Sequence, residues 1–480
     1  MHALSNPTAV PAAWLQALHG LRAQLGAQAV LLGEEVPERN HRDWSQQPPV
    51  APLALVRPSD TEGVAAVLKA CHACGLPIVP QGGLTGLSGG AHPVAQALVL
   101  SLERMTGIEE LDVANATLTV RAGTPLQQVQ EAAEQAGLMF ALDLGARGSC
   151  SIGGNLATNA GGTRVIRYGM ARDLVLGLEV VLADGTVVNG LRKMIKDNAG
   201  FDLRHIFIGS EGALGVITRA VLRLHPRPAC VATALCALPD FEALCALLGQ
   251  ARQGLGAALS AFEIMWPDYW QTATGKVGLR SPFGGEHGMY ALIEMQGADA
   301  HADVQRFEHW LAEQLEAGRI SDAALAQSQA DARDFWALRD ACAEFPLVIG
   351  PHLSYDVGLP LQAMAAFVHD CKRALQAHAP GCESVFYGHV GDGNLHIDAW
   401  VPGLSEGQQP KAAMDLAVYA LVQQHAGSVS AEHGIGTTKR DWLHLSRSPQ
   451  ELMLMRRLKQ ALDPQQILNP GKVLTVASAP

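Results

Sequence analysis

Hydrophobic and polar positions alternate in short blocks over the first half of the chain. Apolar runs separated by glycine-rich turns predict strands within 54–60, 77–83, 97–102, 118–123, 176–188 and 215–224. Residues 61–75, after a Pro-Ser-Asp start signal, have helical spacing of apolar residues and end at a glycine. Asp184-Gly185 joins two alternating runs and predicts a β-hairpin. Strands and turns therefore dominate this region.

The pattern changes after about residue 228. Longer apolar-periodic segments predict helices, and they alternate with predicted strands, which is an α+β layout. The last part of the chain holds a predicted helix followed by the tail ILNPGKV. The helices fall at 241–254, 304–318, 364–378 and 451–463, and the strands at 289–297 and 352–360. We divide the chain into a helical lead-in (1–45) and three further parts (46–228, 229–425 and 426–480).

Composition narrows the class of protein. Hydrophobic residues make up 48% and charged residues 17% of the chain, which is typical of a globular protein. The net charge of −11 disfavours binding to nucleic acid or to an anionic membrane, although a local basic pocket can still hold an anionic substrate. Neither an export signal nor a transmembrane run is evident. We expect a cytoplasmic protein whose nine cysteines form no disulfide framework, with Cys71 and Cys74 as structural residues of a helix.

Two glycine-rich loops are the first candidates for chemistry. PQGGLTGLSGG (80–90) follows a predicted strand, and Gly, Ser, Asn and Thr dominate residues 145–169. Neither matches GxGxxG, so the sequence does not support a Rossmann site. Free backbone N–H groups in such loops can cradle a pyrophosphate. The alternative is a pair of long turns in an all-β domain.

These loops, with GSEGALGVIT (209–218), YGHVGDGNLH (387–396), SAEHGIG (430–436) and ILNPGKV (467–473), resemble the motifs of one flavoprotein family. It is the vanillyl-alcohol-oxidase-like FAD family, in its D-lactate, glycolate and D-2-hydroxyglutarate dehydrogenase branch. GSVSAEHGIGTTKRDWL and ALDPQQILNPGK are most similar to the D-2-hydroxyglutarate dehydrogenases. The resemblance implies an α+β fold with a two-subdomain PCMH-type FAD-binding domain at 46–228. It further implies an α+β substrate (cap) domain at 229–425 and a C-terminal segment, 426–480, that returns to the FAD domain.

The resemblance also implies which residues contact FAD. The first loop would bind the pyrophosphate, the second would line the rest of the cofactor, and later motifs would lie near the adenosine and the isoalloxazine. A histidine that can bind flavin covalently in relatives is absent at Gly82-Gly83-Leu84, so we expect non-covalent FAD. The residues, in the same order, are Pro80, Gly82, Gly83, Thr85 and Gly86; Gly153, Gly154, Asn155, Thr158, Gly161 and Gly162; Gly215 and Ile217; and Asn469.

The segment YGHVGDGNLH predicts a hairpin on its own. With a turn at 391–394, Val390 would lie opposite Leu395 and His389 opposite His396, with Cβ atoms roughly 5 Å apart. Two imidazoles at that spacing can chelate one cation. The alternative is a surface turn flanked by two solvated histidines.

SAEHGIG offers a third ligand and a base. Glu432 would complete a His₂Glu site with an open position, which is typical of catalytic zinc, and manganese, cobalt or iron would fit the same ligands. The resemblance assigns the metal to His389, His396 and Glu432 and the base to His433. Neighbouring residues of a regular strand point to opposite faces, so the sharing of one site by Glu432 and His433 requires an irregular backbone there.

The implied reaction is the oxidation of a D-2-hydroxy acid to its 2-oxo acid. The metal would bind the hydroxyl and one carboxylate oxygen, His433 would take the hydroxyl proton, and the hydride would pass to flavin. Arg339 matches the family's carboxylate-binding arginine, and Asn394 would hydrogen-bond the substrate; the alternative for Arg339 is a helix-surface ion pair with Asp340 or Glu344.

Two positions depart from the D-2-hydroxyglutarate pattern. Ala343 replaces a threonine and Ser354 a lysine, both of which would bind a distal carboxylate. The substrate is therefore either smaller, like lactate, or held by another cation such as Lys439.

Three other functions compete with this one: a metal-free FAD oxidase or reductase of the same fold, a zinc hydrolase, and a non-catalytic FAD-binding protein. The expected partners are a small 2-hydroxy acid and an electron acceptor, which could be a quinone, an electron-transfer flavoprotein, a cytochrome or oxygen. No nucleic-acid partner is expected. A homodimer and peripheral contact with the inner membrane are left open.

Overall fold

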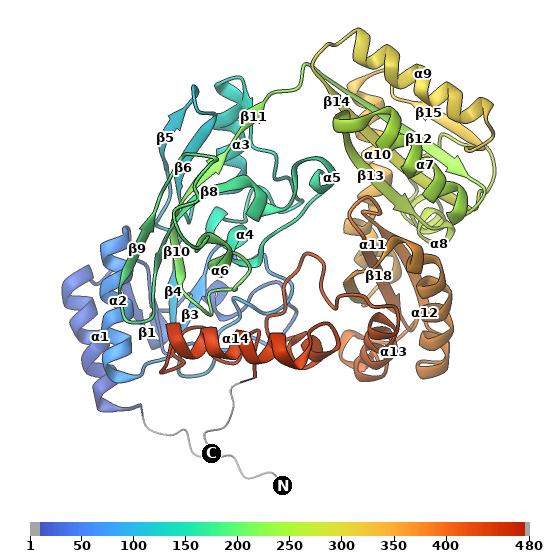
Figure 1. The fold of residues 1–480 in the computed structure, drawn as a ribbon. Helices are drawn as coiled ribbons and strands as arrows, with labels where there is room; N and C mark the ends of the chain where they lie inside the picture. Colours follow the sequence, from blue (N-terminus) through green and yellow to red (C-terminus); the bar gives the residue numbers. More distant parts are fainter. Residues whose placement is uncertain (1–9, 476–480) are drawn as a thin grey trace.

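The first lobe of the protein, at the left of Figure 1, begins with a small sheet in the order β1-β2-β4-β3. The structure is a computed structural model that describes residues 10–475. β2, β4 and β3 run parallel, as βαβ connections require, and β1 is antiparallel to β2. β1 lies within the lead-in 1–45, which therefore contributes an edge strand. The elements are α1 (Ala12–Leu25), β1 (Val30–Leu32), β2 (Ala54–Val56), α2 (Thr61–Cys74), β3 (Ile78–Gln81) and β4 (Leu98–Ser101).

A second, antiparallel sheet in the order β5-β6-β10-β8-β9 completes the first lobe and shares its hydrophobic core. The predicted hairpin at Asp184-Gly185 is confirmed, because Val181 of β8 pairs with Val187 of β9. The elements are β5 (Ile108–Asp112), β6 (Thr117–Arg121), α3 (Leu126–Gln135), β7 (Leu138–Met139), α4 (Ile152–Thr158), α5 (Val165–Tyr168), β8 (Val175–Val181), β9 (Val187–Gly190), α6 (Arg204–Phe207), β10 (Val216–Arg223) and β11 (His225–Pro226).

The second lobe is a seven-stranded antiparallel sheet, β15-β12-β14-β13-β17-β18-β16, with helices packed against it. The predicted α+β layout is confirmed. The strands are β12 (Cys230–Leu238), β13 (Leu259–Met265), β14 (Met289–Gly297), β15 (Asp322–Leu325), β16 (Leu353–Gly358), β17 (Glu383–Gly388) and β18 (Asn394–Trp400). The helices are α7 (Phe241–Gly254), α8 (Pro267–Gln271), α9 (Ala302–Glu316), α10 (Gln329–Arg339), α11 (Phe345–Ile349), α12 (Met364–His378) and α13 (Lys411–Gln424).

The two faces of this sheet differ in polarity. In β18, Leu395, Ile397 and Ala399 belong to the apolar core beneath α7, α9, α12 and α13. The alternate residues Asn394, His396 and Asp398 are also buried, on the opposite face. The same alternation sets Glu263 of β13 and Asp356 of β16 apart from their apolar neighbours. One face of an otherwise apolar sheet thus gathers ionisable groups.

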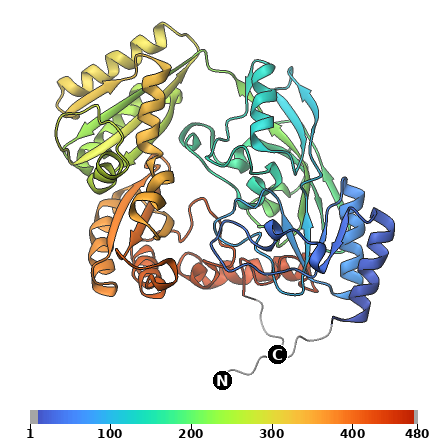
Figure 2. The same cartoon turned by 180° about the vertical axis from the view of Figure 1, so that it is seen from behind.

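The C-terminal segment returns to the first lobe. Helix α14 (Pro449–Leu462) runs along the base of the molecule in both views (Figures 1 and 2). Beyond it, Leu468 forms a parallel bridge with Ile78, and the Asn469 N–H donates to the Ile78 carbonyl at 2.7 Å. No helix among residues 10–475 is long and apolar enough to cross a membrane.

The core of the second lobe offers a stability test. Phe262 is fully buried in β13, so Phe262→Ala should lower the free energy of unfolding by about 3–5 kcal/mol. The matched variant Phe201→Ala, at a side chain that is 92% exposed, should change it by less than about 0.5 kcal/mol. Urea unfolding followed by tryptophan fluorescence measures both, and equal effects would contradict this assignment of the core.

Candidate active site

A cavity of about 1170 Å³ lies between the two lobes. It exceeds the roughly 300–1,000 Å³ of pockets that hold drug-sized ligands, so it has room for an extended cofactor and a small substrate. From the first lobe it is lined by Pro80, Gly82, Gly83, Thr85, Gly86, Gly153, Gly154, Asn155, Thr158, Gly161, Gly162, Gly215 and Ile217. From the second lobe and the C-terminal segment it is lined by Arg339, Ala343, Ser354, His389, His396, Glu432 and His433, among others.

Two candidate residues lie behind the cavity wall. Asn469 is buried, and its amide donates to the carbonyls of Gly90 (3.0 Å) and Glu211 (2.6 Å), so it braces the wall. Asn394 is also buried, and both polar atoms of its side chain lack a hydrogen-bond partner. Neither is among the residues that line the cavity.

The histidine hairpin forms, but its predicted register is wrong by two residues. His396 pairs with Tyr387, and His389 exchanges backbone hydrogen bonds with Asn394 at 3.1 and 3.2 Å, which leaves a four-residue loop, 390–393. Because side chains alternate with period two, a two-residue slip keeps both imidazoles on one face. Their ring centroids are 5.2 Å apart.

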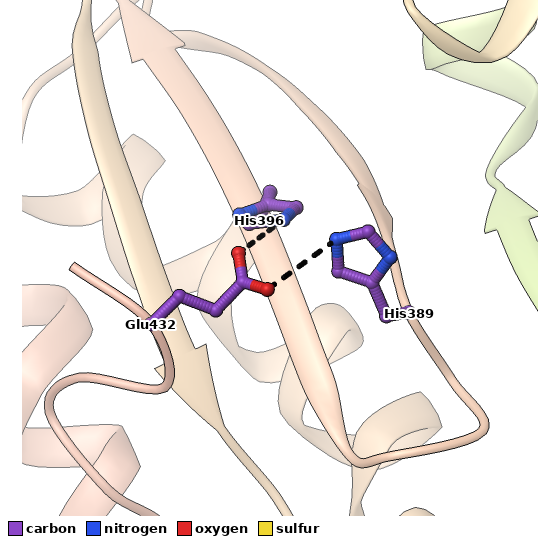
Figure 3. Close-up of side chains that lie close together, drawn as sticks. All are labelled: His389, His396 and Glu432. Carbon is purple, nitrogen blue, oxygen red and sulfur yellow. Dashed lines mark ion pairs between the residues drawn. The ribbon is translucent and has the colours of Figure 1, made fainter. Parts of the chain in front are cut away.

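Glu432 completes the cluster (Figure 3). Its Oε1 lies 3.8 Å from Nε2 of His389 and its Oε2 lies 3.9 Å from Nε2 of His396. Ligands at 2.0–2.2 Å around a tetrahedral cation are about 3.4 Å apart, so a small inward movement would satisfy that geometry. The donor set therefore fits a divalent metal of the zinc type.

The segment 430–436 presents Glu432 and His433 to the same cavity because it is not a strand. The Asp356 carboxylate accepts hydrogen bonds from the N–H groups of Ala431 (3.2 Å), Glu432 (3.0 Å) and His433 (2.9 Å). Gly434 follows with φ of 78°, which favours glycine. The irregular backbone expected here is thus present.

Asp356 also faces an imidazole and an ammonium group. His433 Nδ1 lies 3.7 Å and Lys439 Nζ 3.4 Å from its Oδ2. Burial alone would raise the pKa of Asp356, but His433, Lys439 and His396 hold it well below its ordinary value. Asp356, Glu432 and His433 form a second possible ligand group. Since Asp356 Oδ2 already accepts three backbone hydrogen bonds, the two-histidine group fits a metal better.

Lys439 does not replace the cation missing at Ser354. Its ammonium is buried and donates to the Asp356 carbonyl and to Ser430 Oγ, each at 3.2 Å, away from the cavity lining. The prediction that Lys439 binds a distal substrate carboxylate is therefore wrong, because its ammonium pairs with the Asp356 carboxylate.

The first lobe holds the same segment from its other side. Glu211 accepts the N–H groups of Ile435 (2.7 Å) and Gly436 (2.8 Å). Burial is the largest influence on Glu211 and raises its pKa, against the opposing effect of these hydrogen bonds. Two carboxylates, one from each lobe, therefore clamp the backbone of 430–436.

Arg339 is buried at the end of α10, not at a helix surface. Its Nε donates to Glu263 Oε2 at 2.6 Å, and its Nη2 lies 3.3 Å from His389 Nε2. The other Glu263 oxygen lies 2.7 Å from His389 Nδ1. Glu263 thus orients both a candidate ligand and a candidate substrate-binding arginine, as outer carboxylates do at metal sites. Arg339 does pair with Asp340, at 3.7 Å from Nη1 to Oδ1, but its guanidinium is buried, so a purely surface ion pair is not its setting.

The sequence analysis missed Glu263, Asp356 and Glu211. The first two interrupt the apolar strands LSAFEIM and LSYDVG on the polar face, and a buried carboxylate needs a partner. A carboxylate within an otherwise apolar strand was the signal. Glu211 gives no such signal, because its partners are backbone groups distant in sequence.

Gly161 joins the second glycine loop to the cluster. A Cβ atom at this position would lie 2.6 Å from Oε1 of Glu432. The loop that lines the cofactor cavity and the candidate ligand Glu432 are therefore in direct contact.

The fold and the glycine-lined cavity define an FAD-dependent oxidoreductase, and comparison with known proteins agrees. Residues 52–190 match an FAD binding domain, and residues 227–473 match the C-terminal domain of FAD linked oxidases. The chain belongs to the FAD-linked oxidase family.

Similar curated proteins are D-2-hydroxyglutarate dehydrogenases. One from Xanthomonas citri pv. viticola is 39% identical, over 96% of this chain and 98% of the relative. A mitochondrial one from Bos taurus is 40% identical, over 93% of this chain and 81% of the relative. The crystal structure of p-cresol methylhydroxylase with substrate bound has a TM-score of 0.79 at 18% identity, covering 97% of this chain and 98% of the other, which shows a shared fold.

The contact at Gly161 predicts that Gly161→Ala displaces Glu432. Gly161 has an ordinary φ, so the backbone tolerates alanine, and we expect divalent-metal affinity to fall by at least about tenfold without unfolding. Metal titration with circular dichroism measures both effects. Gly249→Ala, where nothing lies near an added Cβ, is the control. Unchanged metal affinity in Gly161→Ala would contradict the contact.

Proposed function

We propose that the chain oxidises a D-2-hydroxy acid to the 2-oxo acid, with non-covalently bound FAD as the hydride acceptor. The observation that carries the proposal is the opening of the His389, His396, Glu432 and His433 cluster into the cavity lined by both glycine loops. The names of the relatives support D-2-hydroxyglutarate as the first substrate to test.

The metal site belongs to the same proposal. His389, His396 and Glu432 would hold a divalent cation, with zinc as the first choice, and Glu263 would fix the His389 ring through its Nδ1. When bound, the cation supplies a Lewis acid that lowers the pKa of the substrate hydroxyl, and FAD supplies the hydride acceptor. A metal-free oxidase of the same fold would have no use for this donor set.

Three further side chains have roles in the reaction. His433 lies with its ring 6.1 Å from that of His396 and accepts the hydroxyl proton, since a neutral imidazole has a suitable basicity. Asp356 stabilises the imidazolium that results, at 3.7 Å from His433 Nδ1. Arg339 binds the substrate carboxylate, held in position by Glu263.

The choice of substrate depends on two further lining residues of the second lobe. Ala343 and Ser354, where the resembled family has a threonine and a lysine, both line the cavity. Neither is cationic, so the cap domain offers a distal carboxylate no charge at these positions. The quinone, electron-transfer flavoprotein or cytochrome acceptor, the homodimer, the cytoplasmic location and peripheral membrane contact stay predictions from the sequence.

A substrate screen with a dye acceptor tests the proposal. The purified protein should show flavin absorption near 370 and 450 nm, release FAD on denaturation, and oxidise at least one of D-2-hydroxyglutarate, D-malate and D-lactate. Chelator should reduce the rate by about a hundredfold or more, and Zn²⁺, Mn²⁺ or Co²⁺ should restore it.

Each failure in that screen has a distinct meaning. Absence of activity on all three acids would refute the substrate class. Activity that resists exhaustive chelation would favour the metal-free oxidase. A protein that stays colourless after addition of FAD would refute the flavoenzyme.

His433→Asn tests the assigned base. We expect kcat to fall by about a hundredfold or more while bound metal and FAD stay at wild-type levels, because asparagine cannot accept the proton. Steady-state kinetics with metal analysis measures this. Loss of the metal would instead make His433 a ligand, together with Asp356 and Glu432.

A further inference from the structure

An unbalanced cluster of charges lies on the first-lobe wall of the cavity. Asp143 Oδ1 pairs with Arg147 Nη2 at 3.1 Å, and its Oδ2 pairs with Arg164 Nη1 at 3.5 Å. All three residues line the cavity. Two guanidinium groups thus share one carboxylate, which leaves a net charge of +1 on the cluster.

This cluster is close to the candidate active site. Gly162 packs against Asp143, since an added Cβ atom would overlap the Asp143 carbonyl oxygen, and the neighbouring Gly161 packs in the same way against Glu432. Asp340 lines the cavity 3.7 Å from Nη1 of Arg339, and Arg147 lines the same cavity. Arg147 and Arg339 therefore open into one space, in which the substrate carboxylates are expected.

The other cations of the site are already compensated. Within residues 10–475, the arginines and lysines that line the cavity are Arg147, Arg164 and Arg339, and Arg339 is neutralised by Glu263. On the cap side, Ser354 is uncharged and pairs in the sheet with the buried Asp398, which offers no positive charge to an anion. The positive charge available to a second substrate carboxylate is therefore that of Arg147 and Arg164 on the first-lobe wall.

We propose that Arg147, with Arg164 beside it, binds the distal carboxylate of a dicarboxylic D-2-hydroxy acid and so sets the choice of substrate from the FAD-binding lobe. This inference rests on the proposed function and names the substrate class that the site selects. Arg147 is the adaptable member of the pair, because its side chain is 51% exposed and that of Arg164 only 25%. Solvent screening of a half-exposed charge limits the expected effect to about tenfold.

The test is the ratio of kcat/KM for D-2-hydroxyglutarate to that for D-lactate. Arg147→Gln, which makes the cluster neutral, should lower this ratio by about tenfold, mainly through KM for the dicarboxylate. Arg147→Lys keeps the charge and should retain most of the ratio. Asp143→Asn raises the cluster to +2 and should increase the ratio. Arg227→Gln removes an exposed arginine that pairs with Glu134 away from the cavity, and should leave the ratio unchanged.

The other outcomes overturn the inference. An unchanged ratio in Arg147→Gln, equal losses on both substrates, or loss of FAD absorbance near 450 nm would assign Arg147 to structure or to the cofactor. A wild-type enzyme that oxidises D-lactate but no dicarboxylic acid would refute this inference and leave the proposed function standing. A wild-type enzyme inactive on every 2-hydroxy acid would refute the proposed function itself.

Discussion

The hydrogen bonds from the backbone of 431–433 to Asp356 determine how the site is built. They turn the chain so that the adjacent residues Glu432 and His433 both face the cavity, which no regular strand allows. Glu211 holds the following residues from the first lobe. The orientation of a candidate ligand and a candidate base thus depends on two carboxylates whose own side chains point at backbone, not at substrate. Their charge is tolerated in the interior because N–H groups and neighbouring cations satisfy it.

The geometry of the site therefore depends on how the two lobes are positioned relative to each other. The histidines come from a hairpin of the cap sheet, Glu432 comes from the C-terminal segment, and Gly161 of the first lobe contacts Glu432. Tyr168 and Arg167 of α5 add polar contacts to Gln296 of the cap, at 2.9 Å and 2.7 Å. A shift of one lobe would therefore disturb the cofactor wall and the ligand cluster together.

Local patterns in the sequence were sufficient for elements such as α2, α7 and β14, for the glycine loops and for the existence of the hairpin, because strand periodicity, helix signals and Asp-Gly turns act over a few residues. The hairpin register was not predictable, since the mirror symmetry of its residues favoured a loop at 391–394, whereas the chain forms its four-residue loop at 390–393. The ligand set followed from resemblance and not from spacing, because Glu432 lies far along the chain from both histidines. Lys439 was a plausible substrate-binding cation by sequence alone; only its partners, Asp356 and Ser430, reveal its structural role.

The buried charges on one face of the second-lobe sheet are expected to cost stability, which favours a role for them in holding a ligand. Burying Glu263, Arg339 and His389 costs several kcal/mol per ion in desolvation, and apolar residues of similar volume would often be equally stable or more so. The opposite face of the same strands is built of such residues. The charged residues of the polar face therefore lower the stability of the protein, and the fold itself does not need them. Such a cost is expected where side chains must be held in position before a ligand binds. Because Glu263 already holds a histidine and an arginine in place, these groups need not rearrange during the reaction.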